Sequence, residues 1–217
     1  MPEPSILKIN EIFWSFQGEG VKIGFPSIFI RLAGCQLRCP YCDTKDSWED
    51  ENAQSMKVEG ILAKVENYKK RYPQSQVVLT GGEPLGQDLS GLVKELKNRN
   101  FFLSIETDGL HFQDLPIDWW TVSPKDSTGY TIQPDLITYK KINEIKLVVT
   151  PKLKVGKIKE IREKIKGVGE QVLIFLQPEA YDKKRYKRTF SLFQRCQEEG
   201  IDNIRAGMQM HKVYNVR

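Results

Sequence analysis

Three of the four cysteines in this chain lie close together in one short segment. Cys35, Cys39 and Cys42 fall within LAGCQLRCPYCDTKDSW, whereas the fourth, Cys196, is far away in the sequence. A [4Fe–4S] cluster takes four ligands, so three cysteines would leave one of its irons open to an exogenous ligand. The spacing therefore predicts a metal or redox site formed by a single loop.

Zinc is the first alternative at these cysteines. A structural zinc site needs a closed set of four ligands, and the candidates for the fourth are Cys196, His111 and His211. None of them lies at a customary spacing from the three thiols. Arg38 and Pro40 between the cysteines, and Asp43 directly after them, argue against a third interpretation, three packed core side chains.

The composition is that of an enzyme-sized globular chain. Of 217 residues, 40% are hydrophobic and 28% are charged, and the net charge is +5. This predicts one domain over residues 1–217, mildly basic, suited to an anionic substrate and lacking the concentrated charge of a nucleic-acid binder. The start, MPEPSILKINEIF, does not read as a secretory signal, and no stretch is apolar enough for a membrane span. We therefore expect a cytoplasmic protein, in which disulfides are rare.

Apolar, β-branched runs alternate with amphipathic segments of helical period along the chain. The runs predict strands at 27–32, 76–80, 101–107, 119–123, 144–150, 171–177 and 203–208, and the amphipathic segments predict helices at 57–72, 89–98, 157–166 and 184–199. Such repetition is typical of parallel β/α units. Because residues 119–144 offer no helical face, we expect an α/β fold, a partial (β/α) barrel with fewer helices than strands. Residues 6–16 predict an additional N-terminal strand or hairpin.

The segments whose residues could bind ligands or take part in catalysis all follow predicted strands. They are the cysteine loop, GGEP, TDG, SPK and QPEA. In α/β barrels the carboxyl ends of the strands carry the active site. The sequence therefore predicts that these segments converge on one edge.

Two of these segments resemble the radical S-adenosyl-L-methionine (SAM) enzymes. CQLRCPYC is similar to their CxxxCxxC signature, and LTGGEP is similar to their second motif. The resemblance implies a radical SAM-type barrel in which Cys35, Cys39 and Cys42 hold a [4Fe–4S] cluster and SAM chelates the open iron. It also implies that the reduced cluster cleaves SAM to a 5′-deoxyadenosyl radical.

A closer resemblance extends over nearly the whole chain. SFQGEG, IFIRLAGC, CDTK, IETDG, SPK, LQP and MQMHK are similar to segments of the 7-carboxy-7-deazaguanine synthase family. The resemblance implies conversion of 6-carboxy-5,6,7,8-tetrahydropterin to 7-carboxy-7-deazaguanine and ammonia, on the route to queuosine and related 7-deazapurines. It further implies Mg²⁺ and a flavodoxin- or ferredoxin-type reductant. We also expect a homodimer, through an exposed sheet edge or the truncated side of the barrel.

The resemblance places the SAM site in the loops that follow the strands. Glycines in GGEP allow close approach of the backbone, and the Glu83 carboxylate complements a protonated amine. Tyr41 is assigned to the SAM adenine, with packing over the cluster as an equal alternative. The predicted SAM residues are Tyr41, Gly81, Gly82, Glu83, Ser123, Pro124, Lys125, Gln177, Pro178, Glu179 and Ala180.

The resemblance likewise assigns the pterin site. An arginine within an apolar strand needs an anionic partner, which favours Arg31 as a ligand of the substrate carboxylate. Glu106 is the candidate catalytic residue, positioning the substrate or moving a proton. Met208 stands where many members of the family have proline, just before two of the predicted contacts. The predicted substrate residues are Phe16, Gln17, Gly18, Arg31, Thr80, Gln209 and His211.

The predicted Mg²⁺ ligand lies directly after the cysteine loop. On residue chemistry alone, Asp43 is the first choice as a hard oxygen donor. The resemblance favours the hydroxyl of Thr44 instead, whose alternative role is a turn or helix cap.

Two other functions stay open at this stage. A glycyl-radical activase would share the cluster motif but would not need SFQGEG. A non-catalytic iron–sulfur or zinc module would not need GGEP, SPK and QP together. Three further features predict no function: a packed Cys196, a loop His111 and a solvated basic helix face at 183–188.

Overall fold

The computed structural model describes residues 6–49, 51, 53–169 and 171–216. Their contacts divide the chain into two compact units. Unit 1 holds the chain up to Gln17, Gly24–Thr107 and Gln113–Trp119, and unit 2 holds Gly18–Ile23, Asp108–Phe112 and the chain from Trp120 onward. The prediction of one domain over 1–217 stays a prediction.

Unit 1 contains five strands in the order β3-β1-β2-β4-β5. They are β1 (Ile6–Phe16), β2 (Pro26–Leu32), β3 (Gln54–Lys57), β4 (Gln76–Gly81) and β5 (Leu103–Thr107), with helices α1 (Val58–Arg71) and α2 (Ser90–Asn98). β1 pairs antiparallel with β2 and β3, which confirms the N-terminal hairpin. β2, β4 and β5 are parallel, as the sequence predicted.

The two faces of these strands differ in chemistry because side chains alternate along a strand. On β2, Ile28, Ile30 and Leu32 are fully buried. The opposite face carries Phe29 in a cluster with Phe13 and Val78, and the Phe13 and Phe29 rings stack at 5.0 Å. This apolar layer supports the polar side chains farther along the same face.

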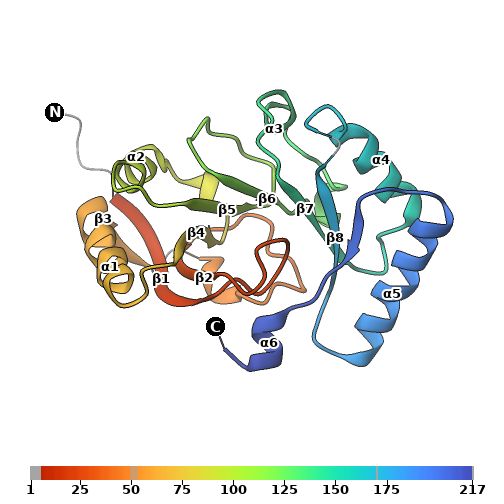
Figure 1. Cartoon of the computed structure of the whole chain (residues 1–217), viewed down its shortest axis with the longest axis horizontal. Coiled ribbons are helices and arrows are strands. Elements are labelled where there is room, and N and C mark those ends of the chain that lie inside the picture. The colour runs from red at the N-terminus through yellow and green to blue at the C-terminus, as the bar shows by residue number, and fades with distance from the viewer. Residues whose placement is uncertain (1–5, 50, 52, 170, 217) are drawn as a thin grey trace. The chain divides into compact units, whose positions relative to one another are not determined.

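Unit 2 contains four parallel strands in the order β6-β7-β8-β9. They are β6 (Trp119–Val122), β7 (Glu144–Val149), β8 (Leu173–Pro178) and β9 (Ile204–Ala206), with α3 (Pro134–Thr138), α4 (Val155–Ile165), α5 (Lys183–Glu198) and α6 (Met210–Tyr214). α4 contacts α5, and α5 packs on β7, β8 and β9 (Figure 1). With nine strands and six α-helices among the described residues, helices are fewer than strands, as expected.

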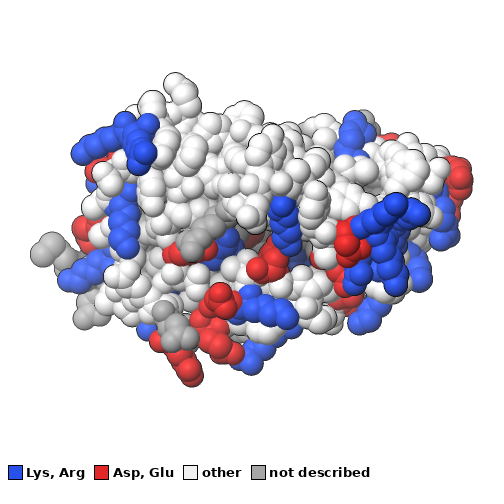
Figure 2. Space-filling view, turned by 90° about the horizontal axis from the view of Figure 1, so that it is seen from below, with Lys and Arg blue, Asp and Glu red and all other residues white. Residues whose placement is uncertain are grey.

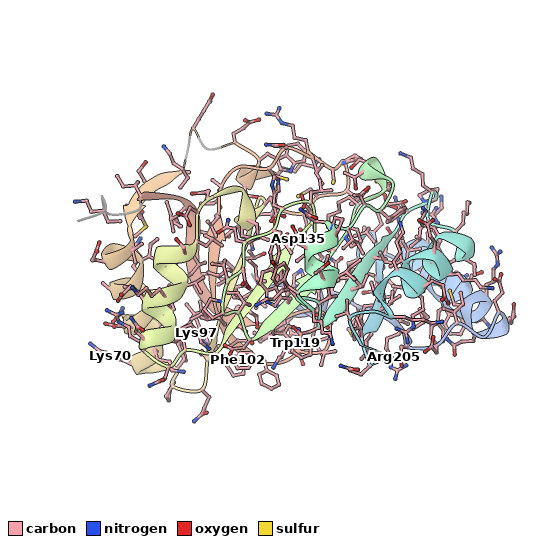
Figure 3. The ribbon with its side chains drawn as sticks, turned by 90° about the horizontal axis from the view of Figure 1, so that it is seen from above. Lys70, Lys97, Phe102, Trp119, Asp135 and Arg205 are labelled. Atoms are coloured by element: carbon pink, nitrogen blue, oxygen red, sulfur yellow. The ribbon has the colours of Figure 1, made fainter. Side chains whose placement is uncertain are left out.

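The β/α connectivity of unit 1 determines at which edge of its sheet the cysteine loop lies. Lys70 and Lys97 lie in the last turns of α1 and α2, and Phe102 directly precedes β5. Figure 3 shows these three residues along one edge, the edge of the strands' amino ends. The cysteine loop and GGEP follow the carboxyl ends of β2 and β4, at the opposite edge.

Three elements lie outside the sequence predictions. β3 is a four-residue strand with three exposed side chains, α3 is a five-residue helix within the stretch that showed no helical face, and α6 is a five-residue helix near the C-terminus. None of them is long enough to produce a hydrophobic period. Among the helices of the described residues, none is long and apolar enough to cross a membrane.

An ion pair connects α4 to the turn before β9. Arg162 is 2% exposed, and its Nε and Nη2 donate to the two carboxylate oxygens of Asp202 at 2.9 and 2.7 Å. The Arg162 guanidinium holds the pKa of Asp202 below its usual value. The folded state therefore gains stability from this carboxylate above its unfolded pKa and loses it as pH falls through the lowered folded pKa.

We expect Asp202→Asn to lower the free energy of unfolding of the apoprotein at neutral pH by roughly 0.5–1 kcal/mol, because solvent screens the exposed Asp202 carboxylate. Asn removes the negative charge that the two guanidinium hydrogen bonds bind. Urea unfolding at several pH values checks this: the difference from wild type should shrink on acidification. A difference that stays constant into acid would contradict the assigned ion pair.

Candidate active site

The cysteine loop is built as a closed turn on unit 1. Its base is held by two backbone hydrogen bonds, from Gly34 N to Ser47 O at 2.9 Å and from Cys35 N to Trp48 O at 3.0 Å. Cys42 N donates to Cys39 O at 3.0 Å. No disulfide joins the cysteines of the described chain. The loop therefore presents three thiols from one hydrogen-bonded segment, a donor set that fits an iron–sulfur cluster.

A backbone amide also points at one of these sulfurs. Thr44 N lies 3.4 Å from Cys42 Sγ and donates to it. Hydrogen bonds to ligand sulfurs are among the ways in which proteins tune cluster potentials. Tyr41, one residue before Cys42, is half-buried in the same turn.

The glycines of GGEP pack against the cysteine loop. A Cβ on Gly82 would lie 2.1 Å from Gly34 O and 2.7 Å from Ser47 O, and one on Gly81 would lie 2.1 Å from Leu32 O. The Gly82 and Glu83 amides donate to Leu32 O and Gly34 O. These glycines therefore allow the backbone to pack closely against the cysteine loop. The sequence analysis had instead attributed the close approach to a bound ligand.

Glu83 is 4% exposed and serves as a local cap. Its Oε1 accepts hydrogen bonds from Leu85 N at 3.0 Å and from Thr107 Oγ1 at 2.8 Å. It thereby connects the end of β4 to the end of β5. A buried carboxylate at this point fits a site for a protonated amine.

Arg31 has an internal anionic partner that the sequence did not identify. Its Nε binds Glu11 Oε1 at 2.9 Å, and its side chain is 17% exposed. Its Nη1 donates to Thr44 Oγ1 at 3.1 Å. Glu11 thus supplies the anion that the sequence argument gave to the substrate alone, and the guanidinium lies directly beside the predicted Mg²⁺ ligand.

The Thr44 hydroxyl is held by hydrogen bonds to other side chains and does not cap a helix. Thr44 precedes the 3₁₀ turn Lys45–Ser47, yet its side chain makes no capping hydrogen bond. Its Oγ1 donates to Asp43 Oδ1 at 3.2 Å. The two candidate oxygens for Mg²⁺ are therefore neighbours, a hard donor pair that fits this ion.

Glu106 lies at the centre of a second polar group in unit 1. Gln17 Nε2 donates to its Oε1 at 2.9 Å, and Thr80 Oγ1 donates to its Oε2 at 3.0 Å. The parallel register of β2 and β4 also places Arg31 opposite Thr80. Four predicted residues thus come together on one face of the sheet, and Phe16, half-buried, ends β1 directly before Gln17.

In unit 2, the SPK loop is tied to the neighbouring strand. Ser123 Oγ donates to Lys146 O at 2.8 Å, and Lys125 Nζ donates to Ser123 Oγ at 2.7 Å. Pro124 between them is buried. The loop is therefore held on β7 at the carboxyl end of β6.

Gln177 in unit 2 is a buried amide whose hydrogen-bonding groups are not satisfied within the part of the chain that the structure describes. It is 2% exposed, and among the described residues neither its Nε2 nor its Oε1 has a hydrogen-bond partner. A buried amide without partners is costly. Its place at the end of β8 fits the SAM contact that the sequence predicted.

The three residues after Gln177 differ in how deeply they are buried. Pro178 ends β8 and is buried, whereas Glu179 and Ala180 are half-buried. Glu179 accepts from Arg188 at 3.4 Å and lies 3.9 Å from Arg185 Nε, both in α5. Figure 2 shows lysine and arginine side chains beside acidic ones on the α5 side, as in a solvated basic helix face.

The C-terminal contacts meet Gly18 and Glu19 of SFQGEG inside unit 2. A Cβ on Gly18 would lie 2.2 Å from His211 Nδ1. Gln209 Nε2 donates to Glu19 Oε1 at 3.0 Å, and Glu19 forms an ion pair with Lys146. Sequence reasoning named Gly18, Gln209 and His211 but missed Glu19 and Lys146.

Cys196 is not suited to serve as a fourth metal ligand. It is fully buried in α5, and burial raises the pKa of its thiol to about 11. A thiol so reluctant to ionise is a poor metal ligand. His111 is half-buried between β5 and β6, as a loop residue.

Comparison with known proteins gives consistent relatives. Residues 29–123 match the Radical SAM superfamily. The chain is 33% identical over 226 residues to the 7-carboxy-7-deazaguanine synthase of Buchnera aphidicola subsp. Schizaphis graminum, covering 96% of this chain and 98% of that protein. It is 29% identical over 219 residues to the 7-carboxy-7-deazaguanine synthase of Aquifex aeolicus, covering 98% and 95%.

A solved structure agrees with these matches. The crystal structure of QueE from Escherichia coli is similar to this chain with a TM-score of 0.74 and 32% identity, covering 95% of each chain. The predicted α/β fold class is thereby confirmed.

Proposed function

Because this chain belongs to the 7-carboxy-7-deazaguanine synthase family of radical SAM enzymes, we propose that it converts 6-carboxy-5,6,7,8-tetrahydropterin to 7-carboxy-7-deazaguanine and ammonia. The observation that carries the proposal is the match along 98% of a named synthase. The family and the enzyme class predicted from the motifs are confirmed by this membership.

Radical SAM enzymes use a [4Fe–4S] cluster and SAM, which when bound supply the one-electron chemistry. Cys35, Cys39 and Cys42 hold the cluster in this proposal, and the Thr44 amide stabilises the Cys42 thiolate. The hydrogen-bonded base of the loop would hold the three sulfurs in place. Their placement on one closed turn supports this assignment.

The chain's own residues would bind SAM in two sets. In unit 1, the Glu83 carboxylate accepts from the protonated amine at the end of β4. Tyr41 in the cysteine loop and Gly81 and Gly82 in the GGEP turn shape the same site. In unit 2, the amide of Gln177 donates to and accepts from the ligand, which removes the cost of its missing partners. The remaining members of the unit 2 set are Ser123, Pro124, Lys125, Pro178, Glu179 and Ala180.

The pterin would be oriented by polar groups and held near Glu106. Arg31 binds the substrate carboxylate with the edge of its guanidinium that does not contact Glu11. Glu106 holds or moves a proton, with Thr80 and Gln17 fixing its two oxygens. The other proposed contacts are Phe16, Gly18, Gln209 and His211.

We also propose that Thr44 supplies a Mg²⁺ ligand, with water and substrate oxygens completing the shell. Thr44→Val removes the oxygen, so we expect the Mg²⁺ concentration for half-maximal activity to rise by about 10-fold or more. Thr44→Ser restores the hydroxyl and should restore the wild-type value. A titration in which only Asp43→Asn changes the Mg²⁺ dependence would move the ligand to Asp43.

The proposed function is tested with the reconstituted enzyme under anaerobic conditions. The protein is mixed with SAM, Mg²⁺, a chemical reductant and the carboxy-tetrahydropterin, and products are followed by mass spectrometry. We expect the deazapurine to accumulate over many turnovers without matching loss of SAM. Cleavage of SAM with unchanged pterin would favour another radical SAM function, such as a glycyl-radical activase. No cleavage at all would favour a non-catalytic iron–sulfur or zinc module.

We further propose a homodimer, a flavodoxin- or ferredoxin-type reductant and a cytoplasmic location. β3 is the outer strand of the unit 1 sheet with three exposed side chains, which supports association through that edge. The net charge of +5 suits an acidic electron carrier. Sedimentation and reduction assays with each carrier check the first two proposals.

A further inference from the structure

The GEG part of SFQGEG is held at both ends by elements of its own unit. At one end, Gly18 O accepts from Met210 N at 2.9 Å, and Gly18 lies against His211. At the other end, Val21 N donates to Glu144 Oε2 at 2.7 Å. The loop is thus fixed between α6 and the first residue of β7.

The middle of the loop is bound to the same strand. Glu19 forms an ion pair with Lys146, and both side chains are less than one-fifth exposed. Lys146 follows Glu144 by two positions, so both side chains lie on the same face of β7. β7 therefore binds the loop at two successive points, Glu19 and Val21.

Glu144 is a buried carboxylate with donors on both oxygens. It is 3% exposed, and Thr121 Oγ1 donates to its Oε1 at 2.7 Å. Thr121 is its register partner on β6. Burying a carboxylate costs free energy unless hydrogen bonds compensate, and here the loop backbone supplies one of the compensating donors, Val21 N. The loop and the carboxylate therefore stabilise each other.

Gly20, the second glycine of GEG, packs so closely against the Glu144 carboxylate that a side chain would not fit there. Gly20 has φ +70, and a Cβ there would lie 2.3 Å from Glu144 Oε1. The loop backbone thus rests directly on the Glu144 side chain. A loop in any other position would lose both this packing and the Val21 hydrogen bond.

We propose that Glu144 is a positioning residue of the substrate site: through Val21 and Gly20 it fixes the loop that carries Gly18 and Glu19. This inference rests on the proposed function. The loop in turn contacts Gln209 and His211, so its displacement would move three proposed pterin contacts together. Glu144 itself touches neither SAM nor the pterin in this proposal.

Three variants of the full-length reconstituted enzyme test the inference. Glu144→Ala removes both acceptors and frees the loop, and we expect the KM for the pterin to rise by about 10-fold or more, since displaced contacts weaken binding. Glu144→Gln keeps an oxygen for Val21 N, and the Thr121 hydroxyl can turn to accept from its amide, so it should return to within about threefold of wild type. Glu163→Ala, on the exposed face of α4, is the matched control and should not change KM.

Two readouts separate positioning from loss of the fold. SAM cleavage without pterin should stay unchanged in all three variants. Hydrogen exchange of the peptide that spans residues 19–23 should be faster in Glu144→Ala and unchanged in Glu144→Gln. Wild-type pterin kinetics with Glu144→Ala would overturn the inference, as would a Glu144→Gln enzyme as impaired as Glu144→Ala. Failure of the proposed function would give a different result. The wild-type enzyme would then form no deazapurine, while hydrogen exchange of residues 19–23 would still be slower in wild type than in Glu144→Ala.

Discussion

Serine at position 35, 39 or 42 is expected to abolish the reductive cleavage of SAM. Each substitution removes one of three thiolates from a loop whose geometry is set by backbone hydrogen bonds. A serine oxygen is a poor ligand for iron in a cluster that thiolates hold. The loss should therefore be complete and not graded, and it should be equal at the three positions.

Iron content and SAM cleavage after anaerobic reconstitution measure this prediction. Wild type should bind about four irons per chain, as a [4Fe–4S] cluster requires, and each serine variant should bind far fewer. Cys196→Ala is the control, because that thiol is buried in α5 with a raised pKa. Full iron content in Cys42→Ser, or its loss in Cys196→Ala, would contradict the assigned ligand set.

The helices and strands with a clear hydrophobic period were predictable from the sequence. α1, α2, α4 and α5 begin and end within two residues of the predicted limits. Their buried faces recur every three or four residues, which the sequence displays directly. β3, α3 and α6 were not predictable, because short elements depend on their neighbours: β3 forms through its pairing with β1.

The candidate site was predictable where motifs are local and not where partners are distant. The three cysteines and GGEP are contiguous segments, whereas Glu11 and Arg31 meet only because β1 and β2 form a hairpin. The contact between Val21 and Glu144 spans still more of the chain. One signal for Glu144 was nonetheless present in the sequence. In EIKLVV, charged residues alternate with buried apolar ones, so one face of a central strand had to be polar.

Replacing Glu106 with glutamine is expected to lower kcat by about 10²- to 10⁴-fold, the usual range for a group that moves a proton. Glutamine preserves the size of the side chain, and its oxygen can still accept from Gln17 while the Thr80 hydroxyl turns to accept from its amide. The substitution therefore removes charge and proton exchange while it leaves the local packing intact. Since Arg31 binds the substrate carboxylate in the proposed site, the KM for the pterin should change far less than kcat.

Single-turnover assays distinguish this role from a purely structural one. The Glu106→Gln enzyme should retain its cluster and should still cleave SAM in the absence of pterin, because Glu106 is not one of the proposed cluster ligands. Thr80→Val is the companion variant: it removes one donor to the carboxylate but leaves the charge, so its kcat should fall by less than that of Glu106→Gln. If Glu106→Gln turns over within about threefold of wild type, the proton is moved by another group. A large increase in KM at unchanged kcat would instead make Glu106 a binding residue, because uniform binding would then be all that it contributes.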